Sequence, residues 1–391
     1  MCDVGVPFHT GANIENTDFT SKERLELLDS HSGSAYISLE ITAILTQECS
    51  FLVHISKKRL DELFAAISGK RIAVLGDLMI DRYIWGAVSR ISPEAPVPVV
   101  DMEVEQARLG GAANVAMNIK SLGGEPLPIG VIGTDNSGKQ LIELIRECKF
   151  PLHGIITDSA RPTTVKTRVI AHNQHVVRID RESKADISYT IQDQIVNVLR
   201  HHFDSIDAII LEDYNKGVIV KSLIKQVIEL SNQHNKIITV DPKFNNFFEY
   251  KNVTVFKPNR HEVEEGLGMR LKNEQDTLAA GKTLLERLNA KSILLTLGEK
   301  GMSLFEDNGK ISHVATKARN VTDVSGAGDT VVSTLTMALA GGATVKEAAT
   351  LSNFAGGIVC GHAGIVPIDK EELRKAVLNE TDHQPRPSGA S

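Results

Sequence analysis

The sequence predicts an α/β fold: a doubly wound, mainly parallel sheet with a small second β-sheet that serves as a lid. Three observations predict it. Short apolar runs end in turns that carry Gly or Asp, segments with helical periodicity separate these runs, and two alternating stretches interrupt the rhythm. The chain has 391 residues, 42% of them hydrophobic and 24% charged, so it has enough apolar material for a large core.

The N-terminal segment differs from the rest, since it mixes Gly, Ser, Thr, Asn and His and carries no motif. We expect residues 1–55 to form a poorly structured extension. A helix is predicted over 56–67, where apolar residues recur at helical spacing after a Ser. The domain is expected to cover 56–378, followed by a disordered tail at 379–391 that is rich in Pro, Ser and Gly.

From Arg71 onward, short apolar runs alternate with helical segments. The predicted buried strands lie at 72–77, 128–135, 208–213, 237–241, 253–257 and 293–298. The predicted helices between them lie at 112–122, 138–148, 191–202, 222–234 and 277–288. Because ligands bind at the carboxyl ends of the strands in such sheets, we expect the polar residues that follow each strand to share one rim.

Two stretches break this alternation, at 83–106 and 163–181, because their apolar and polar residues alternate as in half-exposed strands. We expect them to pair as a small sheet over the rim, a lid that excludes water from a reaction. Such a lid has open edges and an apolar face to cover. A homodimer joined through the lid would cover both.

A Gly-rich turn near the C-terminus, Asp323-Val-Ser-Gly-Ala-Gly-Asp329, leads directly into an apolar helix. The backbone N–H groups of Gly326, Ala327 and Gly328 should converge at the positive end of that helix and bind an anion. Asp329 lies in the first turn, beside this anion site. A base next to an anion site suits phosphoryl transfer to a hydroxyl group. The alternative is a Gly-rich helix start in which Asp329 only stabilises the helix.

Residues after the first predicted strand could bind a sugar. Asp77 and Asp81 can accept hydrogen bonds from hydroxyl groups, although either could equally be a turn residue. Gly110 and Gly111 allow the backbone to approach a ligand closely, and Asn114 follows in the first helical turn.

Charged residues after later strands could bind phosphates and metal. Asn259 and Glu262 share one face of a helical turn and could hold hydrated Mg²⁺, although an ordinary helix start is the alternative. Cations are expected at the same rim and in the lid, where they could bind a phosphate carried by the substrate: Lys216, Lys243, Arg168 and Arg178. Each of these, taken singly, could be a solvated surface residue.

Composition and missing motifs exclude several classes of protein. The net charge is −6 without a basic block, which argues against nucleic acid as the main partner. No apolar run approaches the roughly 20 residues that span a bilayer, and the start does not read as a signal peptide. The four cysteines lack metal or redox spacing, so we expect free thiols in the cytoplasm. Neither a P-loop nor a dinucleotide-binding fingerprint occurs.

The 323–329 turn, the diglycine at 110–111 and the Asn-x-x-Glu at 259–262 together resemble the signatures of ribokinase-like (PfkB) carbohydrate kinases. The resemblance implies a ribokinase-like fold, ATP and Mg²⁺ as cofactors, and Asp329 as the base. It also implies a nucleotide side formed by further residues that match the family: Lys243, Asn259, Thr296, Gly298, Gly301 and Asn353.

Longer runs resemble one branch of the family, the heptose-phosphate kinases of ADP-heptose synthesis. They include 76–83, the specific run Ser89-Arg-Ile-Ser-Pro-Glu-Ala-Pro96 and 110–119. The implied reaction phosphorylates the anomeric hydroxyl of D-glycero-D-manno-heptose 7-phosphate, in the synthesis of lipopolysaccharide precursors. The chain is expected to be the kinase half, with a separate adenylyltransferase in the pathway. Two alternatives stay open: another sugar kinase, for example for fructose phosphates, or a catalytically silent sugar-binding protein on the same fold.

Overall fold

The structure, a computed structural model, describes residues 53–172, 174–316, 322–362 and 364–383. The predicted N-terminal extension therefore lies outside the described residues, apart from its last three positions, of which Ile55 is buried. The last helix, α12 (Lys370–His383), runs past the domain end that the sequence suggested at 378. The remaining predicted tail, 384–391, again lies outside the described residues.

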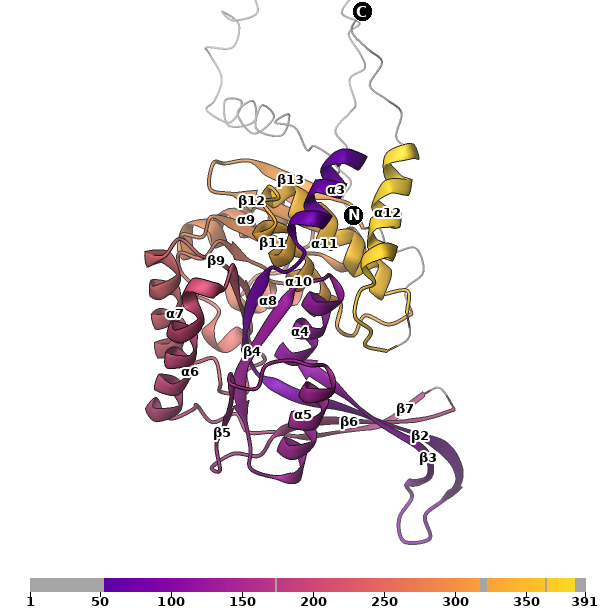
Figure 1. The fold of residues 1–391 in the computed structure, drawn as a ribbon. Helices are drawn as coiled ribbons and strands as arrows, with labels where there is room; N and C mark the ends of the chain where they lie inside the picture. The colour runs from indigo at the N-terminus through magenta and orange to yellow at the C-terminus, as the bar shows by residue number, and fades with distance from the viewer. Residues whose placement is uncertain (1–52, 173, 317–321, 363, 384–391) are drawn as a thin grey trace, which may run out of the picture. The chain divides into compact units, whose positions relative to one another are not determined.

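Over the described ranges, a nine-stranded sheet forms the centre of the domain, in the order β13-β12-β11-β10-β9-β8-β1-β4-β5 (Figure 1). Its strands are β1 (Arg71–Gly76), β4 (Glu125–Ile132), β5 (Ile155–Thr157), β8 (Ala208–Glu212), β9 (Ile237–Asp241), β10 (Val255–Phe256), β11 (Ser292–Thr296), β12 (Met302–Glu306) and β13 (Ile311–Val314). All neighbours are parallel except β11–β12 and β12–β13, which pair antiparallel. The predicted parallel strands are confirmed; the antiparallel hairpin at one edge was not anticipated.

The direction of winding reverses at β1, since β4 lies on one side of it and β8 on the other. Ligands bind at such a switch point in doubly wound sheets. The helices lie on the two faces of the sheet and pack into two hydrophobic cores. One core includes residues of α3 (Lys57–Ala66), α4 (Ala112–Ser121), α5 (Asn136–Glu147), α10 (Ala327–Ala340), α11 (Val345–Val359) and α12. The other core includes residues of α6 (Tyr189–His202), α7 (Lys221–Gln233), α8 (Arg260–Leu267) and α9 (Glu274–Leu288).

Local sequence explains why these elements form. The central strands are continuous apolar runs because helices cover both of their faces, and β1 is buried from Ile72 to Gly76. Side-chain caps define several helix starts. Ser56 accepts from the backbone of Arg59, and Thr344 and Glu347 form a capping box at the start of α11. No helix among the described residues is long and apolar enough to cross a bilayer.

The lid is a four-stranded sheet in the order β3-β2-β6-β7, and its strands extend beyond the body in Figure 1. Its strands are β2 (Leu78–Ile91), β3 (Pro98–Gly111), β6 (Thr164–Ala171) and β7 (Gln174–Arg181). It therefore begins immediately after Asp77, earlier than predicted. Asp81, Gly110 and Gly111 are consequently strand residues of the lid, rather than part of a rim loop and a helix start.

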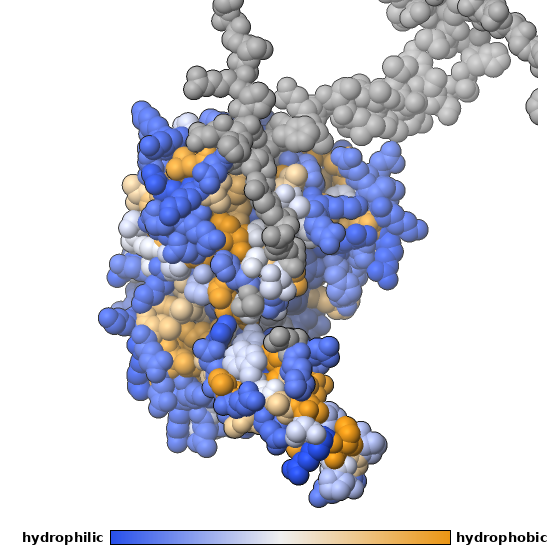
Figure 2. Space-filling view, turned by 90° about the vertical axis from the view of Figure 1, so that its right-hand side faces the viewer, coloured by the Kyte–Doolittle hydropathy of each residue, from blue (hydrophilic) through white to orange (hydrophobic). Residues whose placement is uncertain are grey.

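Apolar side chains lie exposed on the lid, where Figure 2 shows hydrophobic residues gathered on the part farthest from the body. Those exposed by about half or more are Ile91, Val97, Met102, Val104, Val177 and Ile179. Exposed apolar groups that gather on one part of a surface are typical of interaction sites.

Candidate active site

Asp329 lies in the first turn of α10 and is 4% exposed. Both of its carboxylate oxygens accept a hydrogen bond: Oδ2 from the Asn114 side-chain amide at 2.7 Å, and Oδ1 from the Tyr214 hydroxyl at 2.8 Å. These donors come from α4 and from the turn after β8, so three separate parts of the fold orient one carboxylate.

The surroundings tune the acidity of this carboxyl group. Burial raises the pKa of Asp329 to about 6, while the hydrogen bonds from Asn114 and Tyr214 act in the opposite direction. Asp241 raises this pKa and Lys257 lowers it. A carboxyl group with a pKa near 6 is ionised at neutral pH and is a stronger base than an exposed aspartate.

The residues predicted to bind an anion lie at the start of α10. Gly326 is the N-cap and adopts a φ of +77°, in the left-handed region that glycine tolerates. A side chain at Gly328 would lie 3.4 Å from Oδ2 of Asp241 and 3.8 Å from the Lys257 ammonium. The helix start, including Ala327, therefore lies beside a buried cation that could share the charge of a phosphoryl group.

Asp77 follows β1, and its carboxylate binds backbone N–H groups of the turn after β8. It is 1% exposed and accepts the backbone N–H groups of Tyr214, Lys216 and Val218 at 2.8, 3.2 and 3.3 Å. Burial, with Asp213 nearby, raises the pKa of Asp77 to about 6. The Asp77 carboxylate thus holds the turn after β8, and its sugar-binding role stays a prediction.

Asp81 lies on the lid, 3% exposed, and forms an ion pair with Arg168. Gly110, on the neighbouring strand, packs directly against it: a side chain there would lie 2.1 Å from Asp81 Oδ2. Gly111 has a φ of +57° and is the N-cap of α4, which places Asn114 in the first turn as predicted. Glycine at 110 thus leaves room for the Asp81 carboxylate.

Tyr214 occupies the centre of the site, and sequence reasoning did not single it out. Its backbone is held by Asp77 and its hydroxyl bonds Asp329. The ammonium groups of Lys166 and Lys243 lie 4.6 and 5.6 Å from its ring centre. The sequence feature that could have pointed to Tyr214 is its position directly after Glu212 and Asp213, two acidic residues at the end of a predicted buried strand.

Three buried carboxylates gather at the ends of β8, β9 and the start of α10. Glu212, Asp241 and Asp329 each bring one oxygen to within 4.8 Å of the others. Within the described part of the chain, Oε2 of Glu212 is buried without a hydrogen-bond partner. Burial and the two aspartates raise the pKa of Glu212 well above its usual value. An orphaned oxygen in an acidic cluster fits Mg²⁺, which prefers carboxylate ligands.

The predicted metal ligands Asn259 and Glu262 have other partners here. They form the capping box of α8: Asn259 Oδ1 accepts the Glu262 N–H at 2.9 Å, and Glu262 Oε2 accepts the Asn259 N–H at 2.8 Å. The other Glu262 oxygen pairs with Lys243. Although burial lowers the pKa of Lys243, Asp241 and Glu262 raise it overall. In this structure the motif therefore forms a helix start, and its metal-binding role stays a prediction.

The residues expected on the nucleotide side lie around the ends of β11 and β13. Thr296 ends β11 and forms an isolated bridge with Asn259. Gly298 and Gly301 both have positive φ, +61° and +82°, and a side chain at Gly298 would meet open space. Asn353 is buried on α11 and donates to the Ala315 carbonyl at 2.7 Å, which holds the chain after β13.

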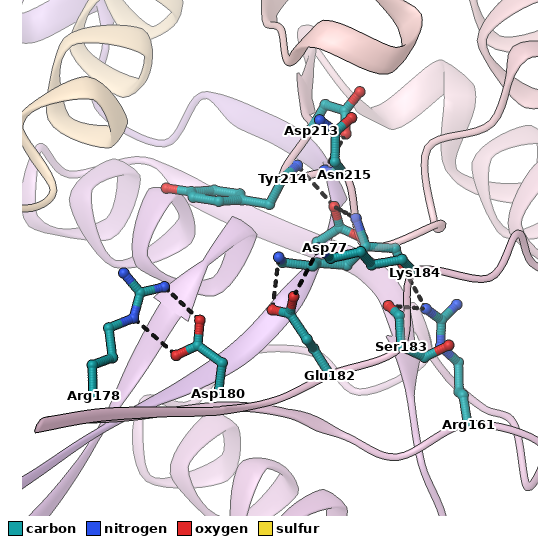
Figure 3. A network of polar contacts seen from close by, with 11 residues as sticks. Asp77, Arg161, Arg178, Asp180, Glu182, Ser183, Lys184, Asp213, Tyr214 and Asn215 are labelled. Atoms are coloured by element: carbon teal, nitrogen blue, oxygen red, sulfur yellow. Dashed lines mark hydrogen bonds and ion pairs between the residues drawn. The ribbon is translucent and has the colours of Figure 1, made fainter.

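The predicted cations lie on the lid (Arg168 and Arg178) and in the segments after β8 (Lys216) and β9 (Lys243), and each has an acidic partner. Arg168 pairs with Asp81; Arg178 pairs with Asp180 at 2.6 Å, and Lys216 with Glu182 at 2.6 Å. Figure 3 shows Arg178, Asp180 and Glu182 below Tyr214 and Asp77. Lys166, a further lid cation missed by the sequence analysis, is 8% exposed.

Comparison with known proteins identifies the family of this chain. A model of the pfkB family carbohydrate kinases matches residues 70–371. The chain belongs to this family. Bifunctional protein HldE of Geobacter sulfurreducens is 40% identical over 317 residues, which cover 81% of this chain and 65% of the relative. HldE of Helicobacter pylori strain HPAG1 is 39% identical over 312 residues, which cover 80% of this chain and 67% of the relative. The chain thus spans about two thirds of the length of these curated relatives.

Solved structures confirm the ribokinase-like fold. Phosphofructokinase-2 from Escherichia coli in complex with potassium has a TM-score of 0.66 at 19% identity, over 80% of this chain and 99% of that one. Arabidopsis thaliana ribokinase complexed with ribose and ATP has a TM-score of 0.63 at 19% identity, over 81% of this chain and 100% of that one. At this identity the likeness concerns the fold alone.

Proposed function

We propose that this protein transfers a phosphoryl group from ATP to the anomeric hydroxyl of D-glycero-D-manno-heptose 7-phosphate, giving the 1,7-bisphosphate. The observation that carries the reaction is the Asp329 carboxylate, buried and oriented by two donors beside the glycine-rich start of α10. The choice of this substrate rests on two findings. The runs 76–83, 89–96 and 110–119 resemble heptose-phosphate kinases, and HldE relatives match about four fifths of the chain.

The chemistry follows from the charges around Asp329. Its carboxylate takes the proton of the attacking hydroxyl, while Asn114 and Tyr214 keep it oriented. The N–H groups at Gly326–Gly328 and the Lys257 ammonium stabilise the charge on the transferred group. Burial lowers the pKa of Lys257, but Asp241 and Glu262 outweigh burial and raise it, so this cation stays charged.

The remaining site residues position the two substrates. Asp81 and Asn114 bind the sugar hydroxyls, and the lid closes over the sugar. Thr296, Gly298 and Gly301 accommodate the nucleotide, and Asn353 fixes the segment beside it. Mg²⁺, implied by the family, would be held by Glu212 and Asp241 and would neutralise charge on the ATP phosphates.

The exposed apolar lid supports a homodimer. We propose that two copies cover the side chains of Met102, Val104, Val177 and Ile179 against each other. The reaction uses ATP and a sugar phosphate, so we place it in the cytoplasm. The product would pass to an adenylyltransferase for ADP-heptose synthesis.

The test is ADP release with Mg-ATP and heptose 7-phosphate, run beside ribose, fructose 6-phosphate and no sugar, with Asp329→Asn as blank. Turnover with the heptose phosphate alone, lost in the blank, supports the proposal. Turnover with fructose 6-phosphate would keep the mechanism and overturn the substrate. Silence with every sugar would favour a sugar-binding protein on this fold.

A further inference from the structure

A pocket lies at the edge of the central sheet opposite Asp329. It opens at the amino ends of β1 and β4, where Arg71 and Glu125 begin the two strands as partners in register. β1 has six residues before it reaches Asp77, so at about 3.3 Å per residue the pocket lies roughly 20 Å from the active-site end of the strand. The volume of the pocket is about 650 Å³, within the range of small-molecule sites. The pocket is therefore large enough for a ligand and separate from the active site.

Part of the wall of this pocket is apolar. Leu127, Phe150 and Ile206 line it, and all three are buried. The imidazole rings of His153 and His202 also line it and stack on each other, with ring centres 4.2 Å apart. Apolar side chains with a few polar groups are the usual lining of small-molecule sites, and stacked rings offer a flat surface to a further ring. The wall can thus contact the organic part of a ligand.

The charged part of the wall is positive, although the whole chain carries a net charge of −6. Among the described residues that line the pocket, Glu125 is the sole carboxylate, and it pairs with Arg71 at 2.8 Å. Lys120 and Lys149 add two ammonium groups that no carboxylate of this wall matches. Burial lowers the pKa of His202, and its basic neighbours lower it further, as a positive local potential requires. The pocket therefore attracts an anion.

The end of α5 brings the two lysines together. Lys120, in the last turn of α4, donates to the Cys148 carbonyl, and its ammonium lies 5.4 Å from the centre of the Phe150 ring. Lys149, the next residue after Cys148, has a φ of +56°. The other non-glycine residues with positive φ in the described ranges are asparagines and one histidine, which adopt this conformation more readily than lysine does. A lysine held in a strained backbone is typical of a functional position.

We propose that this pocket binds a small organic phosphate monoester, with its phosphate between Lys120 and Lys149, at a site distinct from the active site. A phosphate monoester carries a charge of about −1.5 to −2 at neutral pH, so it matches two ammonium groups, whereas a carboxylate matches one. The apolar wall and the two imidazole rings contact the organic part. A nucleotide and a sugar phosphate share this chemistry. This binding does not depend on which sugar the active site phosphorylates.

The experiment is isothermal titration calorimetry of the full chain with AMP, ribose 5-phosphate and inorganic phosphate, in a buffer without phosphate. At least one organic phosphate should bind wild type with a Kd below about 1 mM. Lys149→Gly removes the cation and relieves the backbone, so binding should weaken about 10-fold or more while the urea midpoint of unfolding does not fall. Lys120→Met should weaken binding similarly. Lys251→Gly, which removes an exposed lysine outside the pocket, is the matched control and should bind as wild type does.

The two lysine variants separate this pocket from the active site. The KM for ATP should stay within about twofold of wild type in both, because neither lysine lies at the active site. A Kd that also stays within about twofold in both variants would overturn the proposal, since the probe then binds elsewhere. So would a failure of all three probes to bind, or inorganic phosphate binding as tightly as either organic phosphate. AMP binding about 10-fold tighter than ribose 5-phosphate would support a nucleotide as the ligand, and similar affinities would support recognition of the phosphate and the sugar. If Lys149→Gly does not fold, Lys120→Met decides.

Discussion

Replacing Tyr214 by Phe removes one hydroxyl group and tests how Asp329 is kept ionised. That hydroxyl donates to Oδ1 of Asp329 at 2.8 Å, while Asn114 donates to Oδ2 at 2.7 Å. Both bonds favour the charged carboxylate against burial, which raises the pKa of Asp329 to about 6. Without the Tyr214 hydroxyl, the neutral acid is favoured further, so the pKa of Asp329 must rise.

The size of the rise follows from the strength of the lost bond. A hydrogen bond to a charged group contributes about 1.5–3 kcal/mol, and one pKa unit corresponds to about 1.4 kcal/mol. The pKa of Asp329 in the variant should therefore increase by about one to two units. At pH 7 the ionised fraction would fall from about nine tenths to between about one half and one tenth. Turnover at pH 7 should fall about 2- to 10-fold and recover near pH 9.

The assay is the pH dependence of kcat for phosphoryl transfer between pH 5 and 9. The phosphate of the substrate titrates identically with both enzymes, so a difference between the acidic limbs reports on the protein. Tyr250→Phe is the matched control, because its hydroxyl donates to Asp213 at 2.6 Å and does not contact the base. The reasoning is refuted if the midpoint of the acidic limb in Tyr214→Phe lies within about 0.3 pH units of the wild-type midpoint. An equal shift of that midpoint in Tyr250→Phe would refute it as well.

Four further changes test other parts of the site. Asp329→Asn should lower kcat by about 10³ or more with ATP binding nearly intact; turnover within tenfold of wild type would remove Asp329 as the base. Gly110→Ala places a methyl group 2.1 Å from the Asp81 carboxylate, so the KM for sugar should rise while the KM for ATP holds in steady-state kinetics. Asp77→Ala leaves three backbone N–H groups without their acceptor and should lower the free energy of unfolding by about 2–3 kcal/mol in urea titrations; an unchanged midpoint contradicts this. Val104→Glu charges the exposed lid and should yield monomers by light scattering, whereas Glu103→Gln should not.

Much of the fold was determined by sequence alone, because its signals are local. Continuous apolar runs give buried parallel strands, and the helical spacing between them places helices on both faces. The turn before Asp329 requires glycine at position 326, where φ is +77°. Asp329, Asn114 and the start of α10 were therefore placed correctly, since each depends on a turn and the helix that follows it.

Tertiary structure decided how the charged side chains are used. Asp77 binds the backbone after β8, Glu262 pairs with Lys243, and the Lys166 ammonium lies against the Tyr214 ring. None of these facts follows from the spacing of residues, because each depends on strands and helices far apart in the chain. A charged residue looks the same in the sequence whether or not a partner of opposite charge lies beside it in the fold. Only the fold determines which partner lies within hydrogen-bonding distance, and therefore which charges remain available for a substrate.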